Sequence, residues 1–238
     1  MNGVCKLCKK EAELRHSHIL PEFFYSDIYD ESHRTLKITP SAEWPIQKGI
    51  REYLLCQNCE TKLSRYETYA ARLIRDIPSF DRDEDGRLLY SDNVDYLQFK
   101  LFQLSMIWRA SISKDPGFAQ VKLGPHEEKV RGMLVEEKPG TSSQYGCLMM
   151  TMLNTELLHK VIVGPIVVKP RPFGHTAYKF TTGNIVWLFF ITSHAIDKRV
   201  QDLFLQETGI LKIWLASDEN AAVINIGKIM QEFKKGRQ

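Results

Sequence analysis

The sequence lacks a long apolar segment. No run of about 18 consecutive apolar residues occurs among its 238 residues, and a helix needs roughly that many to cross a membrane. The first residues, Met-Asn-Gly-Val-Cys-Lys, also lack the apolar stretch of a secretory signal. We therefore expect no membrane span and a cytoplasmic protein.

The chain also lacks a large net charge of either sign. The 32 Lys and Arg against 29 Asp and Glu leave a formal net charge of +3. This small excess permits nucleic-acid binding but does not require it. Internal repeats and low-complexity segments are absent from the sequence as well, and its length predicts one large or two small domains.

Cysteine is scarce, with five residues, too few for a disulfide scaffold of this length. Four of them form two Cys-x-x-Cys pairs, Cys5 with Cys8 and Cys56 with Cys59. In a cytoplasmic chain this pattern predicts one closed tetrahedral site for structural Zn²⁺. The alternative is two unrelated pairs that never meet. Cys147 lies in an apolar stretch, where we expect a buried thiol.

The two pairs frame the predicted first domain, residues 1–77. Helical spacing over residues 58–75 is carried by Leu63, Tyr66, Ala70 and Leu73. The second pair is thus expected where a strand leads into this helix, and the first pair in a turn near the N-terminus. A turn pair and a helix-start pair are the layout of a treble clef. Residues 30–49, between the pairs, are expected to be irregular.

The predicted second domain, residues 78–238, is expected to be α+β with its own core. We expect a long buried helix from about Asn93, with Asn93 as its N-cap, and a shorter helix at 126–135. Runs rich in β-branched and aromatic residues predict strands at 161–168, 176–181, 185–192 and 211–215. Thr182-Gly183-Asn184 is a hairpin signal, so an antiparallel sheet is expected. A helix at 220–235 is expected to close the chain.

Between the cysteine pairs lies Ser17-His18-Ile19-Leu20-Pro21, and the second pair is followed by Glu60. Over about residues 4 to 70 this arrangement resembles the HNH endonuclease superfamily, the ββα-metal nucleases. Members with a zinc knuckle carry Asp-His-Ile-x-Pro between the pairs and end on Leu-Cys-x-x-Cys-His. Here the second motif is Leu55-Cys56-Gln57-Asn58-Cys59-Glu60.

The resemblance implies roles for several residues. His18 falls on the general base, which takes a proton from the attacking water. Ser17 replaces the metal-binding Asp, and Glu60 replaces the last metal-binding His, although a carboxylate also suits a catalytic Mg²⁺ or Mn²⁺. His16 would face the same side as His18 on a strand. The second metal site is either rebuilt around Glu60 and His16 or lost.

Basic residues of the same segment are candidates for contacts with phosphates. They are Arg15, Arg51, Lys62 and Arg65. For each one, an ordinary solvated charge is the alternative.

The first hypothesis is a metal-dependent endonuclease, a hydrolase acting on nucleic acid and specifically on DNA. The C-terminal domain would then supply target binding, a homodimer contact or a contact to a protein partner. The alternative is a non-catalytic zinc module that binds nucleic acid or protein, which the substitutions at Ser17 and Glu60 favour. A third reading gives the second domain an unrelated activity.

Other polar motifs have simpler interpretations. Residues 81–92 resemble an EF-hand calcium loop, but an acidic turn between domains explains them better. His126 is expected to begin a helix, with two glutamates near the positive end of its dipole. His194 is expected to end a strand.

Overall fold

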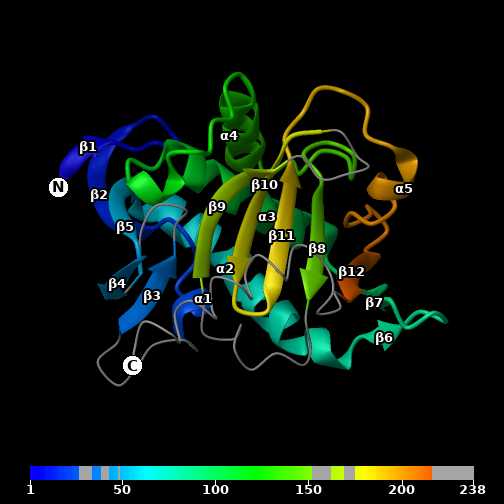
Figure 1. The fold of residues 1–238 in the computed structure, drawn as a ribbon. Helices are drawn as coiled ribbons and strands as arrows, with labels where there is room; N and C mark the ends of the chain where they lie inside the picture. Colours follow the sequence, from blue (N-terminus) through cyan, green and yellow to red (C-terminus); the bar gives the residue numbers. More distant parts are fainter. Residues whose placement is uncertain (27–33, 39–42, 48, 152–161, 169–174, 216–238) are drawn as a thin grey trace, which may run out of the picture.

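The computed structural model describes residues 1–26, 34–38, 43–47, 49–151, 162–168 and 175–215. In this part the fold is mixed α+β, with one small and one large sheet and the helices α2 and α3 behind the large one (Figure 1). The helix expected at 220–235 lies outside the described residues. No helix in the described part is long and apolar enough to cross a membrane.

The small sheet is antiparallel and has the order β1-β2-β5. Its strands are β1 (Asn2–Val4), β2 (Glu11–His18) and β5 (Arg51–Cys56). The chain passes directly from β5 into α2 (Gln57–Asp76), which confirms the predicted helix. The register of β2 and β5 shifts after Arg15, where Leu54 is an extra residue in β5, so Leu54 and Leu55 are both buried.

The segment between β2 and β5 contains regular structure, contrary to our expectation. After α1 (Phe23–Ser26), β3 (Arg34–Ile38) and β4 (Glu43–Gln47) form a hairpin at the edge of the large sheet. β4 contains Pro45 and is the edge strand of the sheet, where proline is tolerated.

The large sheet has the order β4-β3-β9-β10-β11-β8-β12-β7-β6. Its remaining strands are β6 (Asp81–Arg82), β7 (Leu88–Ser91), β8 (Cys147–Thr151), β9 (Ile162–Val168), β10 (Ala177–Thr182), β11 (Ile185–Phe190) and β12 (Leu211–Leu215). The predicted hairpin of β10 and β11 is confirmed, and Gly183 in its turn has a φ of 59°. The sheet is mixed rather than antiparallel, because β3 pairs with β9 and β12 with β8 in parallel.

The remaining helices are α3 (Tyr96–Ile112), α4 (His126–Glu136), α5 (Lys198–Gln201) and the 3₁₀ turns η1 (Ile77–Ser79) and η2 (Pro116–Phe118). The N-cap of α3 is Asp95, two residues after the expected Asn93, and its carboxylate accepts a hydrogen bond from the Gln98 amide. His126 begins α4, as expected.

One continuous core joins both predicted domains, so the expectation of separate cores was wrong. In the first segment, the Phe24 ring lies 6.0 Å from the Trp187 ring of β11 and 6.3 Å from the Phe102 ring of α3. Burial was predicted correctly for Phe99, Phe102, Trp108, Val186, Leu188 and Phe190. Alternate residues of β11 face opposite ways, and a smaller cluster covers its second face with Phe204 and Val200.

Candidate metal centre

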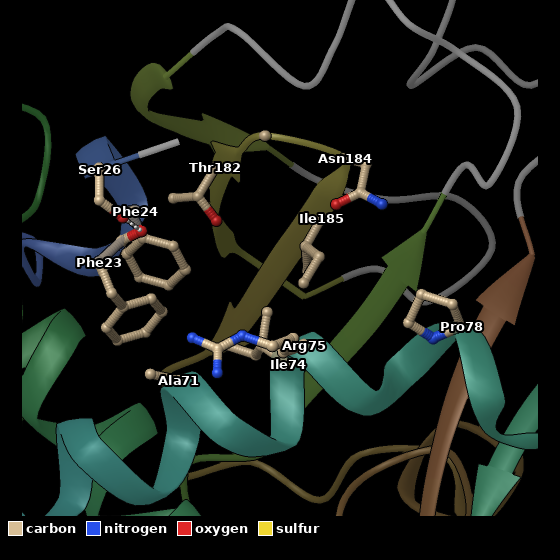
Figure 2. Close-up of a pocket in the computed structure, with 11 residues that line it drawn as sticks. Phe23, Phe24, Ser26, Ala71, Ile74, Arg75, Pro78, Thr182, Asn184 and Ile185 are labelled. Atoms are coloured by element: carbon tan, nitrogen blue, oxygen red, sulfur yellow. Dashed lines mark hydrogen bonds between the residues drawn. The ribbon is translucent and has the colours of Figure 1, made fainter. Parts of the chain in front are cut away.

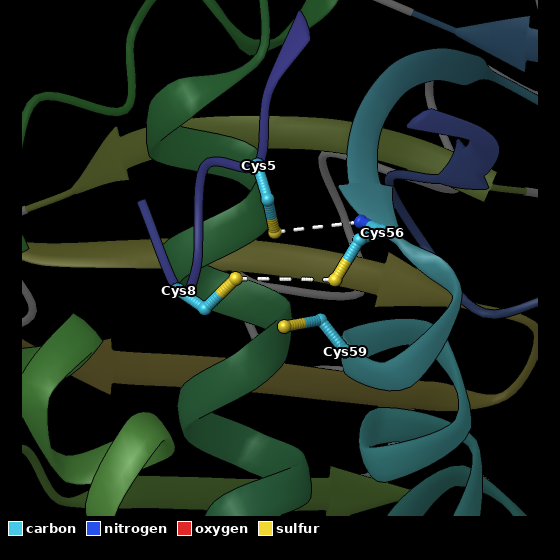
Figure 3. Close-up of side chains that lie close together, drawn as sticks. All are labelled: Cys5, Cys8, Cys56 and Cys59. Atoms are coloured by element: carbon cyan, nitrogen blue, oxygen red, sulfur yellow. Dashed lines mark hydrogen bonds between the residues drawn. The ribbon is translucent and has the colours of Figure 1, made fainter. Parts of the chain in front are cut away.

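The four paired cysteines converge on one point. Their Sγ atoms all lie within 4.8 Å of one another, and the Sγ atoms of Cys8 and Cys56 are 3.9 Å apart. Figure 3 shows Cys5 and Cys8 approaching from the N-terminal turn, and Cys56 and Cys59 from the start of α2. The alternative of two separate pairs is thereby excluded, and this cluster could hold a metal ion.

Local structure explains the convergence. Between β1 and β2 the chain makes a tight turn, in which the Lys9 amide donates to the Cys5 carbonyl and Lys9 adopts a φ of 62°. The Lys6 amide donates to the Leu54 carbonyl at 2.9 Å, which ties this turn to β5. Because β5 runs straight into α2, the second pair lies at the first turn of the helix.

The electrostatics of the cluster call for a cation. Burial raises the pKa of Cys5 and of Cys59. Burial also raises the pKa of Cys8, but hydrogen bonds from the Lys10 backbone and from the other thiols bring it down to about 7. Four thiolates in one small volume repel one another, so a divalent cation is the counter-charge that would allow all four to ionise.

Among the described residues, no other group of three or more His, Cys, Asp or Glu side chains lies close enough to hold a metal. In the loop that resembles an EF-hand, Asp83 Oδ1 instead accepts the amides of Arg87 and Leu88. Residues 81–92 thus contain a turn, as interpreted, but it joins β6 to β7 of the large sheet rather than two separate domains.

His18, the predicted general base, lies at the end of β2 in a polar cluster. Its Nε2 accepts a hydrogen bond of 2.7 Å from Arg51 Nε and contacts the Glu22 carboxylate. Arg51 Nη2 also lies 3.1 Å from Glu22 Oε2. The nitrogen that would accept a proton from water is therefore already engaged by two charged side chains.

Glu60 and Ser17 come together on the opposite side of β2, facing α2. Burial raises the pKa of Glu60, while the Ser17 hydroxyl and then the Arg109 guanidinium oppose this. Glu60 Oε1 is buried and has no hydrogen-bond partner among the described residues. Arg109, from α3, donates to the His18 carbonyl at 2.9 Å and pairs with Glu67 of α2 at 2.6 Å.

This cluster does not suit the divalent cation that the HNH resemblance implies. Mg²⁺ takes six oxygen ligands in a near-ideal octahedron and usually keeps several waters among them, so its site needs room for water. Here the Glu60 carboxylate is buried beside the Ser17 hydroxyl, Arg109 pairs with Glu67, and the guanidinium is itself the cation of the cluster. The orphan oxygen of Glu60 indicates unused acceptor capacity, but the charge of Arg109 beside it opposes a second cation.

His16 lies away from this cluster, on the outer face of the small sheet. Its ring stacks on Tyr53 with centroids 4.9 Å apart, and Tyr53 is 49% exposed. Strand alternation places His16, His18, Arg51 and Tyr53 on one face, here called the hairpin face. Arg15 is half exposed beside it, 3.9 Å from Glu13.

The other two predicted phosphate-binding residues are engaged within the protein. Arg65 Nη2 lies 2.6 Å from Glu137, and Lys62 Nζ donates to the Val135 carbonyl at 2.9 Å. Glu137 also accepts a hydrogen bond from the Tyr66 hydroxyl. These contacts join α2 to the end of α4.

A separate pocket of about 290 Å³ lies between α1, the last turns of α2 and the β10–β11 turn (Figure 2). The rings of Phe23 and Phe24 line one side, and Arg75, Thr182 and Asn184 supply polar groups. The described residues that line this pocket include no His, Cys, Asp or Glu, so it offers no metal ligands like those of the cysteine cluster.

Sequence reasoning missed several residues of the site: Arg109, Glu22 and Tyr53. A signal existed for Arg109, since a charged residue inside a dense apolar helical run must be paired when buried. Tyr53 carried no such signal, because its partner His16 is set by the pairing of β2 with β5. Glu22 carried none either, since it meets His18 and Arg51 only after the chain turns from β2 toward α1.

Comparison of the chain with models of protein families, with curated proteins and with solved structures found no match.

Proposed function

We propose that the chain binds nucleic acid through the hairpin face of a treble-clef module, and that its four cysteines hold a structural Zn²⁺. Four Cys ligands in a compact, closed set are typical of structural zinc. The order of tight turn, β2–β5 hairpin and α2, with one cysteine pair on the turn and one at the helix start, supports a treble clef.

The observation that carries nucleic-acid binding is the exposed stack of His16 and Tyr53. An exposed aromatic ring offers a surface on which an unpaired base can stack. Arg15 beside the stack has a half-exposed guanidinium that a phosphate can reach. The zinc-stapled hairpin would hold this ring and this charge in a constant arrangement.

The test is binding of fluorescein-labelled single-stranded DNA, double-stranded DNA and single-stranded RNA by the zinc-loaded full chain, followed by fluorescence anisotropy. Tyr53→Ala should weaken binding of single strands roughly 5- to 150-fold, because stacking on one base contributes about 1–3 kcal/mol. Binding should also weaken as salt is raised.

Tyr90→Ala is the matched control, since Tyr90 is an exposed tyrosine of β7 in the large sheet. Its affinity for DNA should equal that of the wild type. Absence of binding to DNA and to RNA, or equal affinities of the Tyr53 and Tyr90 variants, would refute the proposal.

Metal-dependent cleavage of DNA by an HNH-type site is the second candidate. It rests on the motif Ser17-His18-Ile19-Leu20-Pro21 with Glu60 after the second cysteine pair. The Ser17 and Glu60 pair lies on the opposite side of β2 from the His18 ring, and its ligand set does not suit a divalent ion. If it holds, wild type should cut DNA with Mg²⁺ or Mn²⁺, and His18→Ala should lose about 10²–10⁴-fold in rate. Glu60→Ala should lose cleavage but keep zinc. If the wild type cuts no DNA under these conditions, the nuclease candidate is excluded and nucleic-acid binding remains as the proposed function.

A further inference from the structure

A cavity of about 470 Å³ is lined by residues at the start of α4, before β8 and after β11. Figure 1 shows these elements at the same end of the large sheet. It brings together two histidines far apart in the sequence, His126 at the start of α4 and His194 in the loop after β11. Its size falls within the range of small-molecule sites. The nucleic-acid proposal uses none of its residues.

The lining of this cavity favours negative charge. Lys129 of α4 joins the two histidines, and the described lining residues include no Asp or Glu. The hydroxyls of Ser143 and Thr192 and the amides of two glutamines add neutral hydrogen-bonding groups. Cationic and neutral donors without a carboxylate suit a phosphate or a carboxylate group.

The wall beside His126 is built around a strained residue. Tyr145 has a φ of 52°, a left-handed conformation that is unusual for an aromatic residue. Its carbonyl accepts a hydrogen bond of 2.9 Å from Lys100 Nζ, and Lys100 is a buried lysine of α3. Its hydroxyl lies 3.1 Å from Nδ1 of His126. Strain of this kind persists only where the surroundings impose it, and it is concentrated at functional sites.

The next residue shows how tightly the wall is packed. A Cβ atom on Gly146 would come within 2.1 Å of the Phe204 ring, so a larger residue does not fit at this position. The Tyr145 ring and the His126 imidazole lie T-shaped at the cavity, with centroids 5.5 Å apart. The contact of Tyr145 with Nδ1 leaves Nε2 of His126 for another partner.

We propose that this cavity is a binding site for a small anionic molecule carrying a phosphate or a carboxylate, held by Lys129, His126 and His194. The charges around His126 agree with this proposal. Burial lowers the pKa of His126 most, and the positive charge of Lys129 lowers it further. Since the described residues that line the cavity include no carboxylate, a bound anion would place a negative charge beside Lys129, His194 and the Tyr145 hydroxyl. The pKa of His126 should therefore rise when the site is filled.

The test is NMR titration of the histidine ring signals of the zinc-loaded full chain with inorganic phosphate and, separately, with acetate, at ionic strength matched with chloride. We expect saturable shifts of His126 and His194 and a higher pKa for His126, while His175, which is not among the described residues that line the cavity, serves as an internal reference. Saturation with phosphate alone identifies a phosphate ligand, and saturation with acetate alone identifies a carboxylate ligand.

Lys129→Ala should weaken anion binding at least about tenfold, since a hydrogen bond to a charged group is lost. Lys129 is exposed, so this variant should fold. Lys138→Ala, a second exposed lysine at the other end of α4, is the control and should bind as wild type. Shifts that do not saturate with either anion, or equal affinities of the two variants, would overturn the proposal.

Discussion

Arg109 carries a full charge inside α3, the most deeply buried helix of the described chain. It is tolerated there because Glu67 neutralises the charge and the His18 carbonyl and Ser105 accept its remaining hydrogen bonds. These contacts connect α3 with both α2 and the end of β2. One guanidinium thus joins the elements that present the cysteine cluster and the hairpin face.

The first prediction concerns this residue. Arg109→Ala should lower the free energy of unfolding by about 3–5 kcal/mol, because Glu67 is left without its partner in a largely dry site. Urea unfolding followed by circular dichroism measures the change.

Arg199→Ala is the matched control, because Arg199 forms an exposed pair with Asp197 at 2.8 Å. Solvent screens that pair, so the control should unfold close to wild type. Similar stabilities of the two variants would show that Arg109 does not join the elements as described.

At the scale of elements, the cysteine cluster joins two parts of the small sheet that are separated by a long segment of the chain. β2 ends at His18 and β5 begins at Arg51, while the chain between them contributes β3 and β4 to the large sheet. Within the described residues, the small sheet has only short antiparallel pairings of its own, and besides them the cysteines and the contacts with α2 and α3 hold it in place. A metal at the cluster would therefore supply much of its stability.

The second prediction tests this. Wild type should contain about one zinc per chain, and Cys56→Ser should lose it and disorder the turn of Cys5 and Cys8 and the start of α2. Elemental analysis measures the zinc, and amide NMR spectra report which segments lose order.

Cys147→Ala is the control, because Cys147 is buried in β8 away from the cluster and should leave the zinc content unchanged. A wild type without zinc, or a Cys56→Ser protein that retains it, would contradict a four-cysteine site.

At the scale of the whole molecule, the continuous core makes the first segment depend on the rest. Phe24 packs against Phe102 and Trp187, and Glu67 pairs with Arg109, so residues from opposite sides of the predicted boundary share one interior. Removing residues 78–238 would expose the apolar face of α2 and leave Glu67 unpaired.

The third prediction follows from this shared core. A fragment of residues 1–77 with zinc should give poorly dispersed amide NMR signals, whereas the full chain should be well dispersed and unfold in one cooperative transition. A well-dispersed fragment spectrum would instead establish an independently folding domain. Zinc bound by the fragment without such dispersion would separate metal binding from folding.

The sequence by itself determined the parts that depend on nearby residues. The two Cys-x-x-Cys pairs, the apolar spacing of α2 and the turn between β10 and β11 each follow from short-range pattern and turn chemistry, and the structure agrees with them. The burial of the central apolar runs could also be predicted from the sequence, because exposing a dense apolar segment to water is unfavourable.

Tertiary structure alone decided which distant groups meet. It joined Arg109 to the His18 carbonyl across 91 positions, added β3 in parallel beside β9, and brought His126 and His194 to one cavity. The physical reason is that a partner for a buried charge or a sheet edge is chosen by packing and register over the whole chain, which local periodicity does not encode.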